Sequence, residues 1–165
     1  LFPDFCIGAG TVLSAESTQE AIGHGAQFIV APNLNEQVAE CCIKNNMAYF
    51  PGALTPTEIE KAWSSGATMV KVFPASQMGP DYIKLLKGPY DEIKMMAVGG
   101  ISPKNIPDYF SAGASAVALG GSIFSTSRMA NGEFSVIQKE IEEFLFAVNQ
   151  IYSNISLTEL VNDSN

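Results

Sequence analysis

This sequence of 165 residues contains few charged and few metal-binding side chains. Only 16% of the residues are charged, and the net charge is −8 with no basic cluster, so nucleic acid is not an expected partner. The single histidine and the three cysteines lack metal-ligand spacing, and we expect neither a metal nor another cofactor. No apolar stretch reaches the roughly 18 residues of a membrane span, so a membrane is not an expected partner either.

Cysteine is also scarce, and Cys6, Cys41 and Cys42 form an odd set. We therefore expect free thiols in a reducing cytoplasm. The high hydrophobic content, 47%, is typical of one α/β domain with a sizeable core. The chain opens on Leu1 rather than methionine, close to an apolar run, which indicates truncation at the amino end.

Short apolar runs, typical of buried strands, recur at nearly even intervals. They cover residues 5–12, 27–32, 48–53, 69–75, 93–100 and 116–122. Helical spacing is found between and after them, at 14–24, 35–46, 57–65, 81–87, 103–112 and 135–151. Ser102 is a candidate N-cap, and Gly25, Gly66 and Gly113 are expected to terminate helices. The alternation predicts parallel strands joined by right-handed crossovers.

An open doubly wound sheet and a (β/α)8 TIM barrel both fit this alternation. The short, even spacing favours the barrel, but a complete barrel typically takes about 200 residues or more. We therefore expect an α/β fold in which strands 3–8 are present and the first two βα units are missing. Residues 1–152 would form this partial barrel, and residues 153–165 a polar tail.

Lys71 is the most unusual residue of the apolar runs. It lies between Val70 and Val72 in a run that Pro74 ends, where a lone ammonium is costly to bury. In an apolar pocket its pKa would fall and the amine would become a nucleophile suited to Schiff-base chemistry. Alternatively, the side chain reaches solvent from the strand end.

Glycine pairs follow the last two apolar runs, at residues 99–100 and 120–121. Each pair lets backbone amides approach an anion, and each precedes a helix whose amino end favours negative charge. Barrel enzymes often bind phosphate between the loops after strands 7 and 8, near a short extra helix, for which 122–125 is the candidate. Two such pairs predict a phosphate site, although tight turning alone would also explain a glycine pair.

Several motifs in order resemble the 2-keto-3-deoxy-6-phosphogluconate (KDPG) and 4-hydroxy-2-oxoglutarate (KHG) aldolase family. They are GAGTVL (8–13), PG (51–52), VKVFPA (70–75), GGISP (99–103) and GGS (120–122). The resemblance runs from about residue 5 to 125 and is most specific around Lys71. It implies a metal-free class I aldolase on a (β/α)8 barrel, usually a homotrimer, that cleaves a 2-keto acid to pyruvate and an aldehyde. The substrate would be a small 2-keto acid, either a phosphorylated sugar acid or 4-hydroxy-2-oxoglutarate.

The resemblance also implies roles for single residues. Lys71 would form the Schiff base, and Thr11 would contact the substrate. Pro32 and Phe73 would wall the pocket, although core packing also explains Phe73. The phosphate or distal carboxylate would lie at Gly99, Gly100, Gly121 and Ser122.

Two departures from the family pattern stand out. The family's general base is a glutamate on an early strand, which here would precede Leu1, and none of the expected strand ends carries a carboxylate. Val98 replaces a threonine that many members have, a pattern closer to the branch acting on 6-phosphogalactonate-derived substrate. Two alternatives to the aldolase remain. One is a phosphate-binding barrel enzyme without a Schiff base, resembling thiamine-phosphate synthases or epimerases, and the other is an inactive fragment.

Overall fold

The computed structural model describes the backbone of residues 5–162 and the side chains as far as residue 151. Short parallel strands alternate with helices along this part of the chain. The strands are β1 (Phe28–Val30), β2 (Ala48–Phe50), β3 (Gly52–Ala53), β4 (Val70–Val72), β5 (Met95–Val98) and β6 (Ala116–Ala118). The helices are α1 (Ala15–Gly23), α2 (Glu36–Lys44), α3 (Pro56–Ser64), α4 (Ala75–Met78), α5 (Pro80–Lys87), α6 (Ile106–Ser111), α7 (Thr126–Ala130) and α8 (Phe134–Asn162).

The strands pair in the order in which they occur along the chain. β1 pairs with β2, and β3, β4, β5 and β6 form a second sheet in that order, with every pair parallel. A doubly wound sheet would reverse its strand order at a switch point, and these described strands show no such reversal. The observed order is therefore that of a barrel-type sheet.

The run at 48–53 was expected as one strand, and Pro51 divides it into β2 and β3. Both halves lie beside the segment that carries β4. The Thr68 amide donates to the carbonyl of Tyr49 and the Lys71 amide to that of Pro51, both at 2.9 Å. The two sheets are thus neighbours in one continuous series.

The run at 5–12 was also expected as a strand, but it makes only one isolated parallel bridge, between Ala9 and Ile29. Thr11 has a φ of +60°, which takes the backbone out of the extended region. The Val12 amide nevertheless donates to the carbonyl of Val30 at 3.1 Å, so the segment still follows β1.

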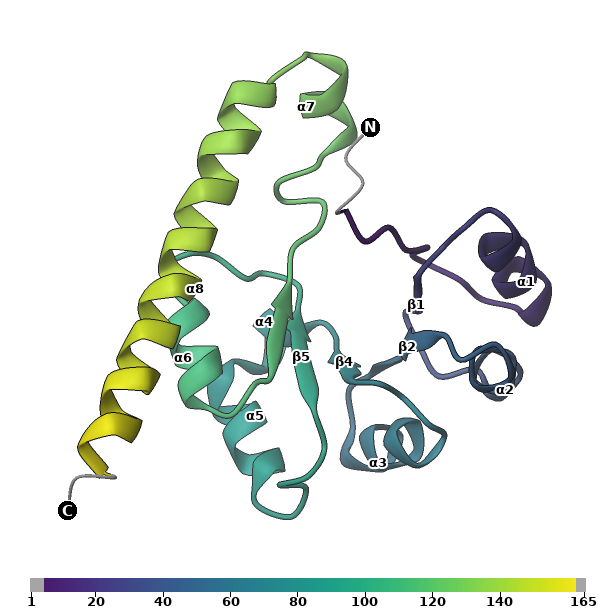
Figure 1. The fold of residues 1–165 in the computed structure, drawn as a ribbon, viewed down its shortest axis with the longest axis horizontal. Coiled ribbons are helices and arrows are strands. Elements are labelled where there is room, and N and C mark those ends of the chain that lie inside the picture. The colour runs from purple at the N-terminus through teal and green to yellow at the C-terminus, as the bar shows by residue number, and fades with distance from the viewer. Residues whose placement is uncertain (1–4, 163–165) are drawn as a thin grey trace.

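The helices form an arc around the outer side of the strands (Figure 1). On β4, Val70 and Val72 are fully buried in the main core, together with Ile59 of α3 and Ile83 of α5. Because side chains alternate along a strand, the residue between these two valines faces the opposite side of the sheet. This side is the inner face of the sheet, and the side chain between the valines is Lys71.

Three helix ends agree with the sequence-based expectation, whereas the start of α6 differs from it. Gly25, Gly66 and Gly113 directly follow the caps of α1, α3 and α6 with positive φ, as predicted for helix termination. Ser102 is not an N-cap, because α6 begins at Ile106 and the Asn105 side chain accepts from the Ser102 amide at 2.8 Å.

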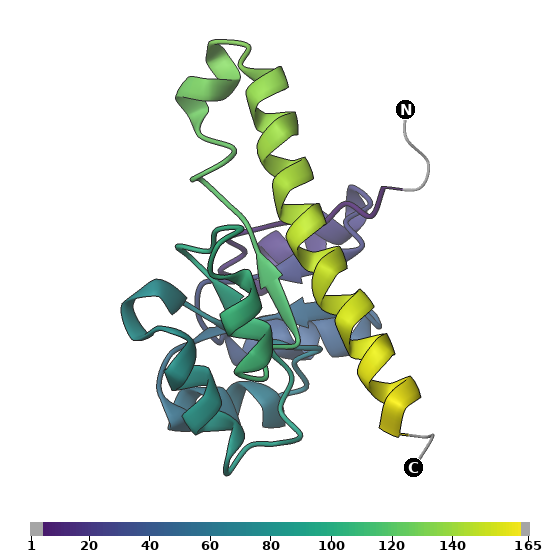
Figure 2. The same cartoon turned by 90° about the vertical axis from the view of Figure 1, so that its left-hand side faces the viewer.

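The carboxyl-terminal part also differs from the expectation. Residues 121–123 form a turn, and the short extra helix expected at 122–125 begins only at Thr126. The long helix α8, prominent in Figure 2, continues to Asn162, so most of the expected tail has a helical backbone. Residues 163–165 of that tail lie outside the described residues.

Candidate active site

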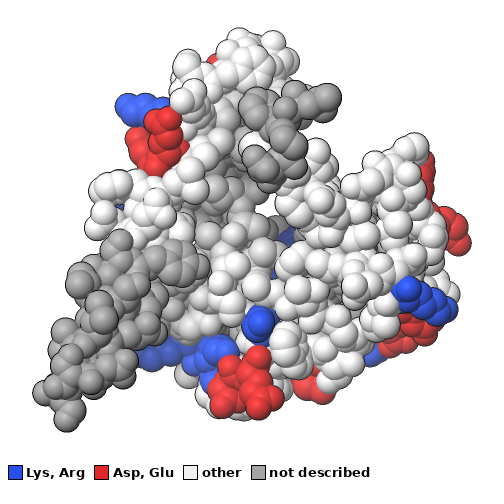
Figure 3. Space-filling view, viewed as in Figure 1, with Lys and Arg blue, Asp and Glu red and all other residues white. Residues whose placement is uncertain are grey.

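A cavity of about 550 Å³ opens on the inner face of the strands. Its lining is mostly apolar and comes from β1, β2, β4, β5 and β6. The lining residues are Phe28, Val30, Phe50, Lys71, Met96, Val98, Ala118, Leu119 and Gly120. Figure 3 shows charged side chains gathered mainly at the margins of one face of the molecule, with most of the face uncharged.

Lys71 supplies the charged group of this cavity. It lies on β4 between two paired neighbours, in register with Gly52 on one side and Met96 on the other. Its side chain is half-buried, and desolvation lowers the pKa of the ammonium from its ordinary value. Among the described residues, no carboxylate lies within ion-pair distance of it. The amine is thus held on a rigid strand without a counter-charge.

Phe73 lies beside this amine. The Lys71 Nζ lies 4.8 Å from the centre of the Phe73 ring, a cation–π contact that favours the ammonium and opposes desolvation. The lowered pKa of the ammonium is caused by desolvation on burial. The ring packs against Gly99, where a Cβ would come within 3.3 Å of it. Gly99 and Gly100 both have positive φ, so this loop needs glycine for its backbone as well as for space.

The second glycine loop, at residues 120–123, has a different geometry. The carbonyl of Gly120 accepts from the amides of Ile123 and Phe124, at 3.0 and 3.1 Å, which makes a single helix-like turn. Within the described part of the chain, the amides of Gly121 and Ser122 have no protein acceptor. A Cβ at Gly120 or Gly121 would meet nothing within 4 Å, so packing does not require glycine at either position.

Thr11 and Pro32 do not line the cavity that contains Lys71. Both side chains are exposed, each at a strand end or extension. Thr11 is β-branched with φ +60°, a strained conformation of a kind that clusters at functional sites. A Cβ at Gly52 would lie only 2.0 Å from the carbonyl oxygen of Pro32. Pro32 therefore packs directly against β3, the strand in which Gly52 pairs with Lys71.

Two acidic side chains of the helices have their partners outside the cavity. Glu36 pairs with Lys61 at 2.6 Å, and Glu58 accepts the amides of Leu54 and Thr55 at the start of α3. No carboxylate is among the residues that line the cavity. In the described part of the chain, no three His, Cys, Asp or Glu side chains converge on a possible metal position.

Sequence reasoning missed the aromatic wall of the cavity. Phe28 and Phe50, from β1 and β2, meet edge to face with ring centres 6.0 Å apart. The sequence pattern could have revealed this wall. Phe28 is next to Ile29 on β1 and Phe50 is next to Tyr49 on β2, and both of these neighbours are buried on the outer side of the strands. Period-two alternation would have assigned both rings to the inner face.

The fold and the cavity define a class of protein: a barrel-type parallel α/β protein with a single lysine in an apolar cavity. Comparison with known proteins then gives the family. Residues 2–140 match the family model described as "Aldolase: KDPG and KHG aldolase". The chain therefore belongs to the KDPG and KHG aldolase family, which confirms the resemblance of its motifs.

Individual relatives agree with this assignment. The chain is 42% identical over 128 residues to 2-dehydro-3-deoxy-phosphogluconate aldolase of Haemophilus influenzae, which covers 77% of this chain and 60% of that enzyme. A solved structure described as "Native KDPGal structure" superposes with a TM-score of 0.83 at 32% identity, covering 90% of this chain and 70% of the other.

A KDPG aldolase of Legionella pneumophila, solved "with pyruvate captured at low pH as a covalent carbinolamine intermediate", gives a TM-score of 0.75 at 27% identity. The match covers 84% of this chain and 68% of that structure. The chain spans about 60% of the length of the curated relatives that it matches. Among the described residues, no helix is both long and apolar enough to cross a membrane.

Proposed function

We propose that this protein is a class I aldolase in which Lys71 forms a Schiff base with a 2-keto acid. The observation that carries the proposal is the position of Lys71: on a paired strand, in an apolar cavity, with a lowered pKa and no carboxylate partner among the described residues. A neutral amine is the nucleophilic form, and desolvation increases its population near neutral pH. The covalent carbinolamine in the Legionella relative supports the same chemistry.

The reaction begins when the Lys71 amine attacks the ketone carbon to give a carbinolamine, which loses water to form an iminium. The iminium withdraws electrons from the C3–C4 bond. A base removes the proton of the C4 hydroxyl, the C3–C4 bond breaks, and its electron pair forms an enamine while the aldehyde leaves. Protonation and hydrolysis of the enamine consume one water and release pyruvate and the free amine.

The anionic distal end of the substrate would lie at the two glycine loops. The amides of Gly121 and Ser122 are free of protein acceptors within the described residues, and the Gly99–Gly100 pair directly follows β5, the strand that pairs with β6. Backbone amides without a protein acceptor at a loop favour a phosphate or a carboxylate. Phe73 would wall the pocket near the reacting carbon, and Thr11 and Pro32 would contact the substrate from the side of β1.

The general base is the part of the site that the described residues do not supply. No carboxylate lines the cavity, so the proton of the C4 hydroxyl needs an acceptor from elsewhere. A positioned base typically contributes about 10²–10⁴-fold to the rate. We expect that the 165-residue chain alone forms the iminium but turns over slowly, and that an added carboxylate base increases turnover.

The substrate is proposed to be a 2-keto-3-deoxy-6-phospho sugar acid, with 4-hydroxy-2-oxoglutarate as the smaller alternative. The printed names of the relatives include both gluconate- and galactonate-derived substrates. Val98 lines the cavity, and a valine at this position resembles the galactonate branch of the family, which supports that choice. Comparing kcat/KM for the two C4 epimers tests this choice. We further propose residues 1–152 as the partial barrel, a homotrimeric assembly and a cytoplasmic location.

The decisive experiment is borohydride reduction of the full-length protein in the presence of pyruvate. We expect a mass increment on the peptide that holds Lys71, since reduction converts the iminium into a stable secondary amine. Lys71→Met should abolish both the adduct and aldol cleavage. Lys94→Met is the matched control, because Lys94 is an exposed lysine that directly precedes β5, the strand beside Lys71, and should leave both unchanged.

A folded sample without any adduct would reject the Schiff base. That outcome would favour a phosphate-binding barrel enzyme in which Lys71 acts only through its charge, resembling thiamine-phosphate synthases or epimerases. An adduct without cleavage of any tested substrate would instead identify an inactive fragment that retains its nucleophile.

A further inference from the structure

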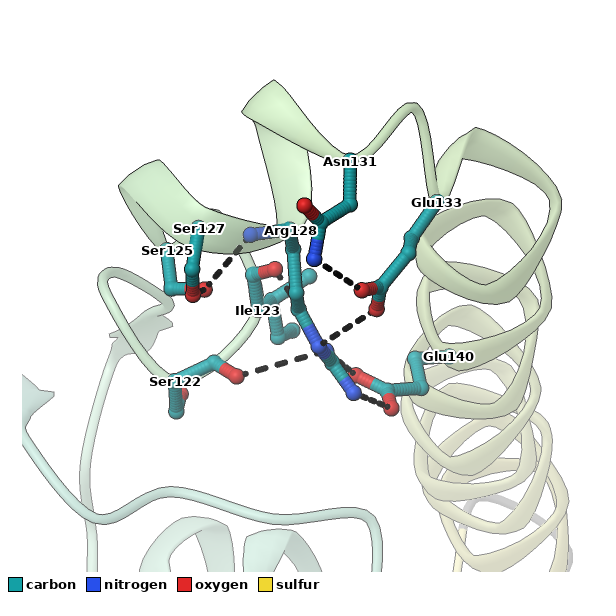
Figure 4. Close-up of polar contacts among 8 residues, drawn as sticks. All are labelled: Ser122, Ile123, Ser125, Ser127, Arg128, Asn131, Glu133 and Glu140. Carbon is teal, nitrogen blue, oxygen red and sulfur yellow. Dashed lines mark hydrogen bonds and ion pairs between the residues drawn. The ribbon is translucent and has the colours of Figure 1, made fainter.

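Arg128, on the short helix α7, lies outside the cavity but makes a dense set of contacts (Figure 4). Its Nη1 and Nη2 donate to Oε2 and Oε1 of Glu140 on α8, both at 2.7 Å, in the bidentate geometry of an arginine–carboxylate pair. Its Nε lies 3.7 Å from Oε2 of Glu133. The Arg128 side chain is 25% exposed, so this network is partly shielded from water.

The same guanidinium also contacts the backbone of the second glycine loop. Nη1 donates to the carbonyls of Ser122 and Ile123, each at 3.4 Å. One side chain therefore joins the segment after β6 to α8. Helix α8 is in turn anchored in the main core by Ile137 and Phe144, which are buried.

The hydrogen bonds within the turn relate these contacts to its free amides. The amides of Ile123 and Phe124 donate to the Gly120 carbonyl, so the peptides of the turn run roughly parallel. Their carbonyl ends face Arg128, while the amides of Gly121 and Ser122, which have no acceptor among the described residues, lie at the opposite end of the turn. A cation at the carbonyl end fixes the direction of those amides and is favourably aligned with the peptide dipoles.

We propose that Arg128 is a positioning residue that holds the turn at residues 120–123 so that its free amides bind the distal anion of the substrate. The proposal rests on the proposed function in taking this anion to be the substrate's phosphate or carboxylate. Arginine suits the role because its planar fork can bind both oxygens of Glu140 and still donate to backbone carbonyls. Lysine, with a single nitrogen, cannot reproduce this arrangement.

The test measures binding of inorganic phosphate to the full-length protein by calorimetry. Arg128→Gln and Arg128→Lys should both weaken phosphate binding by about tenfold, the effect of misdirecting one or two charge-assisted hydrogen bonds. Lys61→Gln is the matched control, because it also removes an ion pair between two helices, that of Lys61 with Glu36, but far from the loop in sequence. It should leave phosphate affinity unchanged.

A second readout separates positioning from a general structural role. Borohydride trapping with pyruvate, which has no distal anion, should be as efficient in Arg128→Gln as in the parent, while KM for a phosphorylated substrate rises about tenfold. If Arg128→Gln fails to fold, Arg128→Lys provides the same comparison. Phosphate affinity equal to that of the parent in the folded variant, or no phosphate binding by the parent, would overturn the proposal.

The two proposals fail in different ways. A parent protein that binds phosphate but gives no pyruvate adduct would reject the Schiff-base function, and the phosphate measurements would still decide the role of Arg128. A parent that gives the adduct, with equal losses of trapping and phosphate affinity in Arg128→Gln, would keep the function and reject positioning in favour of general stabilisation.

Discussion

At the scale of single residues, burial of Lys71 lowers the stability of the fold and increases the share of neutral amine. Its lowered pKa means that, between that pKa and the ordinary value of 10.5, the unfolded chain binds more protons than the folded one. Stability attributable to this group therefore rises with pH across that window, and the cost of burying the ammonium is fully present below it. The burial that would prepare the amine for attack in the proposed reaction thus lowers the stability of the fold at neutral pH.

Replacing the amine by an apolar group should remove this cost to stability. Lys71→Met should raise the free energy of unfolding at pH 7 by about 1 kcal/mol, a modest value because the side chain is only half-buried. The advantage should shrink as the pH approaches 10.5, where the parent lysine is neutral as well. Urea denaturation across this pH range measures it, with Lys94→Met as the exposed control. A variant that is no more stable than the parent at pH 7 would contradict the account.

Residue-level reasoning from the sequence succeeded where a single side chain conflicted with its local pattern. Lys71 was predicted to lie on a strand, with its side chain either in an apolar pocket or reaching solvent from the strand end. It lies on β4 and lines a cavity, because strand alternation between two buried valines leaves one direction for its side chain. The partners of Arg128 were not predictable in this way. Glu140 lies on another helix, and only the turn between α7 and α8 brings the two side chains together.

At the scale of elements, the break between β2 and β3 is the clearest case in which tertiary packing overrides a local pattern. Apolar residues at 48–53 favour one strand, but Pro51 has no amide to donate to a neighbouring strand. In addition, the backbone of Gly52 packs closely against the backbone of Pro32. The alternation of strands and helices was predictable because it depends on periodicity. The start of α6 was not, because the Asn105 side chain turns the backbone before the helix begins.

The fit at Gly52 can be measured directly. Gly52→Ala would place a Cβ 2.0 Å from the Pro32 carbonyl, a contact with backbone that no side-chain rotation relieves. We expect a loss of about 3 kcal/mol in the free energy of unfolding, seen as a lower urea midpoint. Gly10→Ala is the matched control, because its Cβ would meet nothing within 4 Å, and it should change stability by no more than about 0.5 kcal/mol. Equal free energies of unfolding for the two variants would contradict the prediction and show that the backbone at Pro32 can shift at little cost.

At the scale of the whole molecule, the described strands form an open series. β6 pairs only with β5 within the described residues, and at the other side no further described strand pairs with the segment that follows β1. Large apolar side chains are exposed near these edges, among them Phe5 (69%), Ile7 (66%) and Phe124 (48%). Unpaired strand edges with apolar side chains favour pairing with other chains.

The 165-residue chain on its own is therefore expected to self-associate. Sedimentation velocity over a range of concentrations should show growth in mass, and Ile7→Lys should reduce it by placing a charge at one edge. A monomer with a cooperative, high-temperature unfolding transition would refute the expectation.

The contacts of Arg128 with the turn at residues 120–123 and with α8 have a consequence for how a protein of the proposed function changes over evolutionary time. Lys71, the proposed nucleophile, is held by the hydrogen bonds of β4, whereas the turn proposed to bind the distal anion is held by Arg128 and Glu140 of α8. Substitutions in the segment after β6 can therefore alter which aldehyde portion is accepted without disturbing the covalent step. A family built in this way can diversify its substrates in one short stretch of chain while inheriting its chemistry unchanged.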